Sequence, residues 1–444
     1  MKYIYLILFL LTLAITTISC EAEDGTNGVD GANGRNAGLE FLVFAGDITD
    51  EDAAQIISEN FGKTTVAILV TNTINLTTLE LPEIATMTKV ILTNNKKLQR
   101  IVLPNLEHVS NKIVIESNPS LTTVDLENLI SAGNIYFENN KALTSINISK
   151  LDRAQNFIFD QNPLLQSINL PKLIKITDEF KILNHENLST LDASALIITN
   201  EIFVRENVNL LTIDFSSLTN TGKISISQNP ILETVNLSQL TRNTDAINLN
   251  INPKLTTIAL PNLSYSESLG IANNADLQTV SCAALIKLNG ELTISNNPNL
   301  ASLHFPRITS IGSETRRSPI NIRGNNMIKN IDFSSLETFF ANIVTIESDV
   351  LEMVNLNSLT TFSDLRIESD ATLNSMKISS VLDFTNLQLP KTPTEDIDTL
   401  FTRLVNITPA ITGKRISVGG TASTQALIDA ETLRTNGNTV VIRP

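Results

Sequence analysis

Two aspartates, Asp192 and Asp214, are the residues whose types and spacing come closest to an acid–base pair. They occupy the same position in two neighbouring sequence repeats. Stacked repeats would bring their backbones to within about 4.8 Å of one another, and paired carboxylates hydrolyse polysaccharides in many enzymes. However, a row of Asp and Asn is also expected on any solvent-facing sheet, and no cluster of Lys, Arg or His accompanies the pair. We therefore expect a non-catalytic protein.

The other reactive side chains predict neither a metal site nor a cofactor. The three histidines, His108, His185 and His304, fall in different repeats without metal-ligand spacing. Cys282 occupies a position that is apolar in other repeats, so we expect it to be a small core residue. Calcium on the Asp/Asn row stays an alternative because it prefers oxygen ligands, although a flat sheet rarely supplies six of them.

The overall composition narrows the choice of partners. The 444 residues carry 32 basic and 46 acidic side chains, for a formal net charge of −14. Such a charge disfavours nucleic acid and bare anionic membrane as partners. Two cysteines exclude a disulfide framework. We expect a monomer that contacts protein or, as a weaker alternative, glycan.

Residues 1–20 form a targeting segment. Met1 and Lys2 precede an apolar run from Ile4 to Ile15, which is too short to span a bilayer comfortably. The run ends at Thr17-Ile18-Ser19-Cys20, which resembles the lipobox of bacterial lipoproteins although that family usually has Leu where Thr17 stands. The resemblance implies acylation of Cys20 and attachment to outer-membrane lipid. Ordinary secretion with cleavage nearby is the alternative.

Residues 21–38 are expected to form an acidic, glycine-rich tether. The acidic residues that follow Cys20 resemble the signal that sends some lipoproteins to the outer face of the outer membrane, so we expect surface exposure, with periplasmic retention as the alternative. Glycine then recurs at every third position from Gly25 to Gly34. Four triplets without proline are too few for a collagen helix, and a flexible spacer is expected instead.

A motif of 22 or 23 residues recurs fourteen times between Val66 and about Phe384. A fixed period in this range predicts a solenoid. One interval is 28 residues long, because Gly312–Ser318 is inserted before the twelfth repeat. The apolar anchors of the repeats are Leu76, Leu98, Leu121, Leu143, Leu165, Leu188, Leu210, Leu232, Leu255, Leu277, Leu300, Ile328, Leu351 and Leu373.

The rows around the anchors predict two short strands in each repeat. Positions three, five and eight after the anchor are almost always apolar, and a second alternating stretch such as Ile113-Val114-Ile115 precedes it. Alternation with a period of two indicates strand, and no window is long enough for a regular helix. One repeat cannot offset its own conformational entropy, so neighbouring repeats must stack. We predict a mainly β fold, a right-handed β-solenoid over residues 66–385 with about fourteen coils.

Two polar rows accompany the apolar ones. Asn stands three residues before the anchor in ten of the fourteen repeats, including Asn118 and Asn229. Stacked amides can bond each other and the turn backbone, so this row is expected to be structural. Thr or Ser two residues after the anchor and Asp or Asn four residues after it should share the outward face of one sheet.

Both ends of the solenoid are expected to carry small α/β caps, because open sheet edges invite aggregation. In the first cap, residues 39–65, we expect a strand at Leu42–Phe44 and a helix at Asp50–Asn60. The second cap covers residues 386–444. Its expected elements are a helix opened by a capping box at Thr392-Pro393-Thr394-Glu395, a strand at Lys414–Val418, a helix at Thr424–Thr435 and a strand at Thr439–Ile442.

The repeat resembles that of receptor L domains. The phrase N-P-x-L-x-x-[IV]-x-L-P-x-L, followed by an x-I-x-I strand, is similar to the leucine-rich-type repeat of these domains, which occur in growth-factor receptors, fungal cell-wall proteins and bacterial surface lipoproteins. Gly46-Asp47-Ile48-Thr49 and Asn60-Phe61-Gly62 are similar to the opening of such domains. The resemblance covers about residues 41–385 and implies binding or adhesion without identifying binding residues.

The expected function is therefore that of a lipid-anchored surface protein that recognises another protein. A structural envelope component without a dedicated ligand is one alternative. A glycan-binding or carbohydrate-active solenoid is another, disfavoured because only Tyr136 and Tyr265 remain beyond the targeting segment and Trp is absent. Candidate binding residues are Arg316 and Arg317 in the insertion, because insertions in solenoids cluster on binding faces, together with Asp192 and Asp214.

Overall fold

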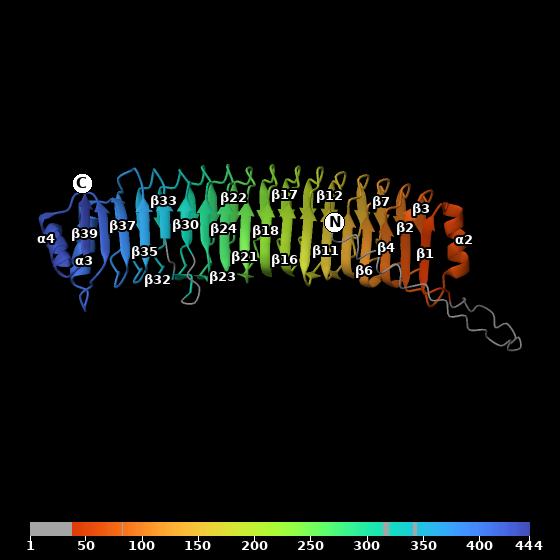
Figure 1. Cartoon of the computed structure of the whole chain (residues 1–444), viewed down its shortest axis with the longest axis horizontal. Helices are drawn as coiled ribbons and strands as arrows, with labels where there is room; N and C mark the ends of the chain where they lie inside the picture. The colour runs from red at the N-terminus through yellow and green to blue at the C-terminus, as the bar shows by residue number, and fades with distance from the viewer. Residues whose placement is uncertain (1–37, 82, 314–318, 341–343) are drawn as a thin grey trace, which may run out of the picture.

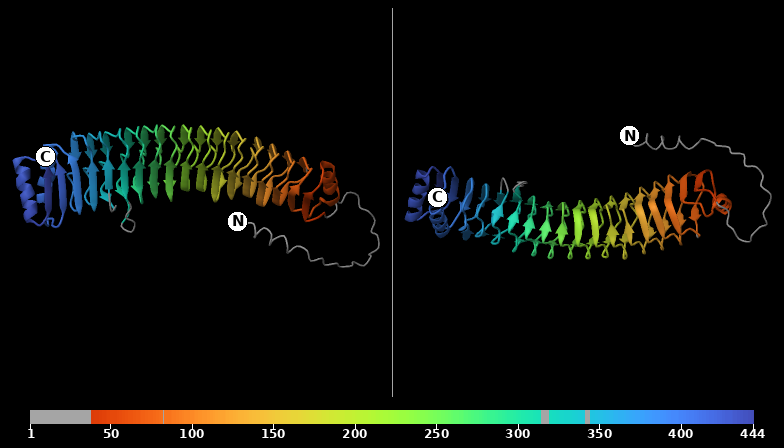
Figure 2. Two further views of the ribbon diagram at one scale, coloured as in Figure 1. Left: turned by 45° about the horizontal axis from the view of Figure 1, so that its top comes forward. Right: turned by 90° about the horizontal axis from the view of Figure 1, so that it is seen from below.

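The chain folds into an elongated, gently curved rod of stacked turns (Figures 1 and 2). The computed structural model describes residues 38–81, 83–313, 319–340 and 344–444. The targeting segment with Cys20, the tether as far as Ala37 and the inserted Arg316 and Arg317 lie outside these described residues. The predicted fold class, a mainly β solenoid with few helices, is confirmed.

One parallel sheet of 25 strands runs the length of the rod. Its long strands come one from each turn and lie side by side in Figure 1. They are β1 (Phe41–Gly46), β2 (Ala67–Thr73), β4 (Thr86–Thr93), β6 (His108–Glu116), β8 (Ser131–Glu138), β11 (Asn156–Asp160), β14 (Glu179–Leu183), β16 (Ile198–Arg205), β18 (Asn220–Ser227), β21 (Ala246–Asn250), β24 (Ser268–Ala272), β27 (Leu292–Ser295), β30 (Ile320–Arg323), β33 (Val344–Glu347), β35 (Asp364–Glu368), β37 (Asn386–Lys391), β38 (Arg415–Gly419) and β39 (Thr439–Arg443).

Two-residue strands join the same sheet at its margin. They are β10 (Arg153–Ala154), β13 (Lys175–Ile176), β20 (Arg242–Asn243), β23 (Tyr265–Ser266), β26 (Lys287–Leu288), β29 (Ser310–Ile311) and β32 (Thr338–Phe339). The turns number about 18 because the parallel pairing of the large sheet continues past the repeats. It includes β1 at one end and β37, β38 and β39 at the other. The caps are therefore part of the same sheet.

Three-residue strands make the opposite wall of the rod. They form four small parallel sheets, and their members are β3 (Thr78–Glu80), β5 (Arg100–Val102), β7 (Thr123–Asp125), β9 (Ser145–Asn147), then β12 (Ser167–Asn169), β15 (Thr190–Asp192), β17 (Thr212–Asp214), β19 (Thr234–Asn236), then β22 (Thr257–Ala259), β25 (Thr279–Ser281), β28 (Ser302–His304), and finally β31 (Asn330–Asp332), β34 (Met353–Asn355), β36 (Ser375–Lys377). Each described repeat thus has the two strands and no helix that its sequence predicts.

The core lies between these two walls. Alternate side chains of each long strand point inward, so that in β16 Ile202 and Val204 are fully buried while their neighbours face out. The anchor leucines are buried throughout. Aromatic side chains stack between turns, with ring centroids 4.7 Å apart for Phe137 and Phe159. Such pairs add about 0.5–1.5 kcal/mol beyond the area that they bury.

The asparagine row is structural, as predicted. The Nδ2 of Asn118 donates to the backbone oxygen of Leu92 at 3.0 Å and to Oδ1 of Asn140 at 3.1 Å, and the backbone N–H of Asn118 donates to the same Oδ1 at 3.1 Å. The same bonds recur from turn to turn. We call this row the asparagine ladder; its fully buried members are Asn95, Asn118, Asn140, Asn162, Asn207, Asn229, Asn252, Asn274, Asn297 and Asn325.

The N-terminal cap closes the first turn with a helix. Helix α2 (Asp50–Asn60) begins at a capping box in which the Thr49 side chain accepts from the backbone of Asp52. The carboxylate of Asp50 accepts the backbone N–H groups of Thr77, at 2.6 Å, and of Thr78, at 3.1 Å. One turn later, the equivalent N–H, that of Gln99, donates to the backbone oxygen of Thr77. Asp50 therefore replaces the carbonyl of a preceding turn that does not exist.

The C-terminal cap contains α3 (Thr394–Val405) and α4 (Thr424–Thr435). The predicted capping box at Thr392 is wrong, because the N-cap of α3 is Pro393 and no side chain caps the helix. Thr392 directly follows β37 and is buried. Its hydroxyl donates to the backbone oxygen of Pro390 at 2.9 Å. The carboxylate of Asp396 accepts the backbone N–H of Met376 on the last short strand at 2.7 Å.

Candidate functional site

The aspartate pair lies where its spacing predicts. Asp192 of β15 and Asp214 of β17 are register partners on adjacent turns. Each Oδ1 accepts a backbone N–H two residues further on, from Ser194 at 3.0 Å and from Ser216 at 2.8 Å. Asn236 makes the same bond one turn later. These bonds shape the turn that follows each short strand, so both carboxylates serve the scaffold, and their assignment to binding stays a prediction.

No metal centre is found within the described ranges, because they contain no group of three or more His, Cys, Asp or Glu that could hold an ion. Cys282 is fully buried, and this burial raises the pKa of its thiol to about 12. A thiol of that kind is unreactive at neutral pH. Arg316, Arg317 and Cys20 fall outside the described residues, and their assignments also stay predictions.

His185 has a place that the sequence analysis did not recognise. It stands in the asparagine ladder, between Asn162 and Asn207, and is fully buried. Its Nδ1 lies 3.2 Å from Oδ1 of Asn207, while its Nε2 has no hydrogen-bond partner. Burial lowers the pKa of this imidazole to about 4. The signal was available, since His185 is the residue three positions before the anchor Leu188.

The clearest surface that the scaffold does not explain is an outward row on the large sheet. Its side chains come from the same register position of successive long strands, and the inward neighbours of each are buried. We call it the apolar row; its members are Val43, Leu69, Ile91, Val114, Tyr136 and Ile158. Val43 is 51% exposed, and the others are half-buried.

The apolar row ends in the middle of the rod. The next register partners are Lys181 and Phe203, after which the row turns polar with Ser225 and Asn248. The long strands pair in parallel in both halves, so pairing does not require the change from apolar to polar. An apolar stripe confined to part of one face is typical of an interaction surface.

Charged side chains flank the apolar row on both sides. Lys89 and Lys112 are register partners on one flank. On the other, Glu116, Glu138 and Asp160 are consecutive partners. The pKa of Glu138 is raised by its burial and by the carboxylates of Glu116 and Asp160. An apolar centre with a charged rim is the usual anatomy of a protein–protein interface.

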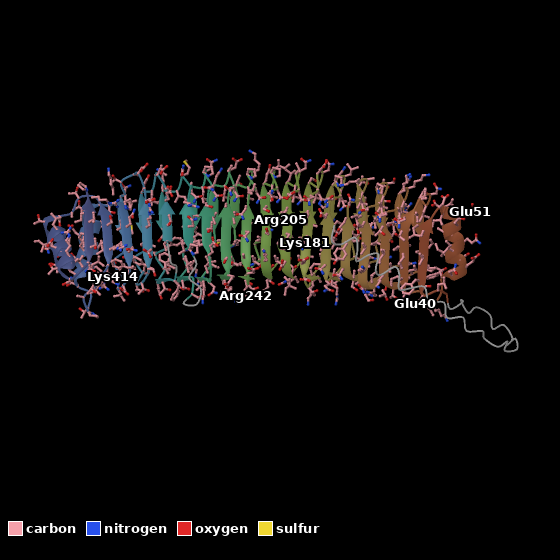
Figure 3. All side chains as sticks on the ribbon, in the orientation of Figure 1. Glu40, Glu51, Lys181, Arg205, Arg242 and Lys414 are labelled. Atoms are coloured by element: carbon pink, nitrogen blue, oxygen red, sulfur yellow. The ribbon has the colours of Figure 1, made fainter. Side chains whose placement is uncertain are left out.

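Three cations surround one ring where the apolar row ends. The Lys181 Nζ and the Arg205 guanidinium each lie 5.1 Å from the centroid of Phe203, and the Lys223 Nζ lies 5.5 Å from it. Figure 3 shows Lys181 and Arg205 close together at the middle of the rod. The Arg205 Nη2 also donates to the Ser225 hydroxyl at 2.8 Å, which fixes the guanidinium. Aromatic and arginine side chains held in this way are typical hot spots of interfaces.

This surface was not predicted from the sequence, although its residues could be identified there. Each member of the apolar row stands between two buried residues of a long strand, as Leu69 does between Ile68 and Val70. The alternation in each strand predicted which side chains are buried. The outward half becomes a surface only when the register between turns is known.

Among known proteins, some solved structures show a distant similarity to this chain. No family model matches the chain, and no curated protein matches it in sequence. A leucine-rich repeat protein from Bacteroides ovatus shares 14% identity over 85% of this chain and 92% of its own, with a TM-score of 0.32. The functional domain of InlJ from Listeria monocytogenes shares 16% over 86% and 75%, with a TM-score of 0.27.

The pneumococcal vaccine antigen PcpA shares 12% identity over 83% of this chain and 80% of its own, with a TM-score of 0.20. No described helix is long and apolar enough to cross a membrane.

Proposed function

We propose that this chain is a lipid-anchored, surface-exposed lipoprotein of the receptor L type, which recognises an extracellular protein along the apolar row without catalysing a reaction. The observation that carries the proposal is the row itself, because six register partners expose apolar side chains where the scaffold needs none. The mixed charges beside it favour a protein partner with a complementary rim.

The anchoring half of the proposal rests on Cys20 and the segment before it. Labelled palmitate is expected to enter the full chain and not the Cys20→Ala variant, which should be released from the outer-membrane fraction. Protease treatment of whole cells should then digest the rod if it faces the exterior. Equal labelling of the two chains would contradict anchoring, and protection in intact cells would place the rod in the periplasm.

If the apolar row recognises a partner, introducing charge into the row should strongly reduce the amount of partner that the protein captures. The double variant Ile91→Asp/Val114→Asp should retain at least about tenfold less of the cell-surface protein that co-purifies with the wild type, because one desolvated aliphatic side chain contributes about 1.5–3 kcal/mol and tenfold corresponds to about 1.4 kcal/mol. Quantified co-purification from surface-labelled cells measures this.

The matched control is Asn248→Asp/Thr293→Asp, which adds the same charge to the polar half of the same outward row. It should capture the partner as the wild type does. Equal loss in both double variants would contradict recognition by the apolar row. If no protein co-purifies specifically with the wild type, a structural role in the envelope is favoured instead.

A further inference from the structure

A second surface lies on the turns that follow the long strands. In each of these turns the residue just before the asparagine ladder has a left-handed backbone. The non-glycine members of this column, with φ between 53° and 59°, are Asn72, Asn94, Ser117, Asn139, Gln161, Asn184, Glu206, Gln228, Ile251, Asn273 and Asn296. Asn tolerates this conformation better than other side chains do, which accounts for its frequency here.

Ile251 is the one β-branched residue among these column members, and its φ is 58°. The neighbouring turns impose that conformation, since the Ile251 N–H donates to the backbone oxygen of Ala272 at 2.9 Å and the next residue, Asn252, belongs to the ladder. A β-branched residue is strained in the left-handed conformation. The isoleucine therefore opposes the stability of the turn, although 47% of its surface is exposed and it fills no core.

Two further features lie in the same turns. Val208 stands in a column where the next two turns have Pro230 and Pro253, and it is 49% exposed. His185 interrupts the ladder in the adjoining turn. Val208, Pro230, Ile251 and Pro253 line a single groove of about 610 Å³. Val208 and Ile251 thus place exposed aliphatic side chains beside two prolines where the surface is hollowed.

The groove also has a defined charge. Glu186 and Glu206 line it and are exposed, and within the described part of the chain neither carboxylate forms an ion pair. Carboxylates beside an apolar floor complement a segment that has an aliphatic side chain next to a cation. The proline rings restrict the backbone of the wall, so little ordering is needed on binding.

We propose that this groove binds a partner's peptide segment in which an aliphatic residue stands next to Lys or Arg. The aliphatic side chain lies against Ile251, Val208 and the two prolines, and the cation pairs with Glu186 or Glu206. The groove lies on the turns and the apolar row on the outward face of the sheet, so each surface can fail its test without the other.

The test uses the purified protein and a labelled heptapeptide of alternating lysine and leucine. Saturable binding to the wild type is expected. Ile251→Asn should bind about tenfold more weakly while its thermal midpoint rises, because asparagine relieves the backbone strain. The matched control is Gln161→Asn, which changes the same column outside the groove and should leave affinity unchanged. Glu186→Gln/Glu206→Gln should also weaken binding by about tenfold and reduce its dependence on salt.

Opposite changes in stability and affinity separate a binding role from a structural one. The proposal is overturned if the peptide shows no saturable binding, or if a leucine–glutamate heptapeptide binds equally well. It is likewise overturned if Ile251→Asn keeps full affinity, since Ile251 would then not contact the peptide. A lowered thermal midpoint would also overturn it, since Ile251 would then be part of the scaffold.

Discussion

Replacing Asn229 with alanine should lower the free energy of unfolding by about 4 kcal/mol, the larger of two stability effects expected from the asparagine ladder. The Nδ2 of Asn229 donates to the backbone oxygens of Val204 and Ser227, each at 3.1 Å, and its Oδ1 accepts the backbone N–H of Asn207 at 3.1 Å. Each buried group left without a partner costs about 1–3 kcal/mol. Alanine would remove the partner of all three of these backbone groups at once.

Asn236→Ala is the control for this experiment. Asn236 is exposed, and its Oδ1 accepts one local N–H, from Ser238 at 3.2 Å. We expect a loss of about 1 kcal/mol or less for this variant. Because turns of a solenoid open locally, hydrogen exchange should show faster exchange in the turns next to Asn229 before the ends respond. Equal losses in the two variants would contradict a structural ladder.

Acidification should destabilise the rod through His185. The native imidazole has a pKa lowered to about 4 by burial, whereas the ordinary value is 6.5. Above pH 6.5 the histidine is neutral in both states and its stability contribution is complete. Between pH 6.5 and about 4 the unfolded chain binds a proton that the native chain excludes, so stability falls, by up to about 3 kcal/mol.

His185→Asn should remove this pH dependence and raise stability at neutral pH. Asparagine supplies an Oδ1 and an Nδ2 at the ladder position where the histidine Nε2 has no partner. Urea unfolding at pH 7 and pH 4.5 measures both effects. His108→Asn, at an exposed histidine on β6, should keep the wild-type slope. A slope that persists in His185→Asn would assign the acid sensitivity to the carboxylates instead.

The fold was predictable because the same residue types recur at the same positions in fourteen repeats. The buried rows and the asparagine ladder follow from periodicity, and the elements of both caps follow from local strand and helix patterns. The strands and helices lie within a residue or two of their expected positions. The exception, the start of α3, occurs once: Thr392 has the composition of a cap, but the strand before it holds that residue in the core.

The candidate surfaces were less predictable, for a physical reason. Phe203 meets Lys181 and Lys223 because the three residues come from successive turns, and their contact depends on register that one repeat does not reveal. Ile251 could have been noticed as an isoleucine in a column that is otherwise polar and rich in Asn. Its meaning required the left-handed backbone, which the sequence alone does not specify.

The carboxylates of Asp50 and Asp396 set a limit on how the rod can associate. Each occupies the hydrogen-bonding site that another turn would use, one at either end of the stack of short strands. A second molecule approaching end to end therefore meets a charged helix in place of free N–H groups, and strand addition there is blocked. Copies of the rod therefore cannot join end to end through the wall of short strands, whatever other contacts they make.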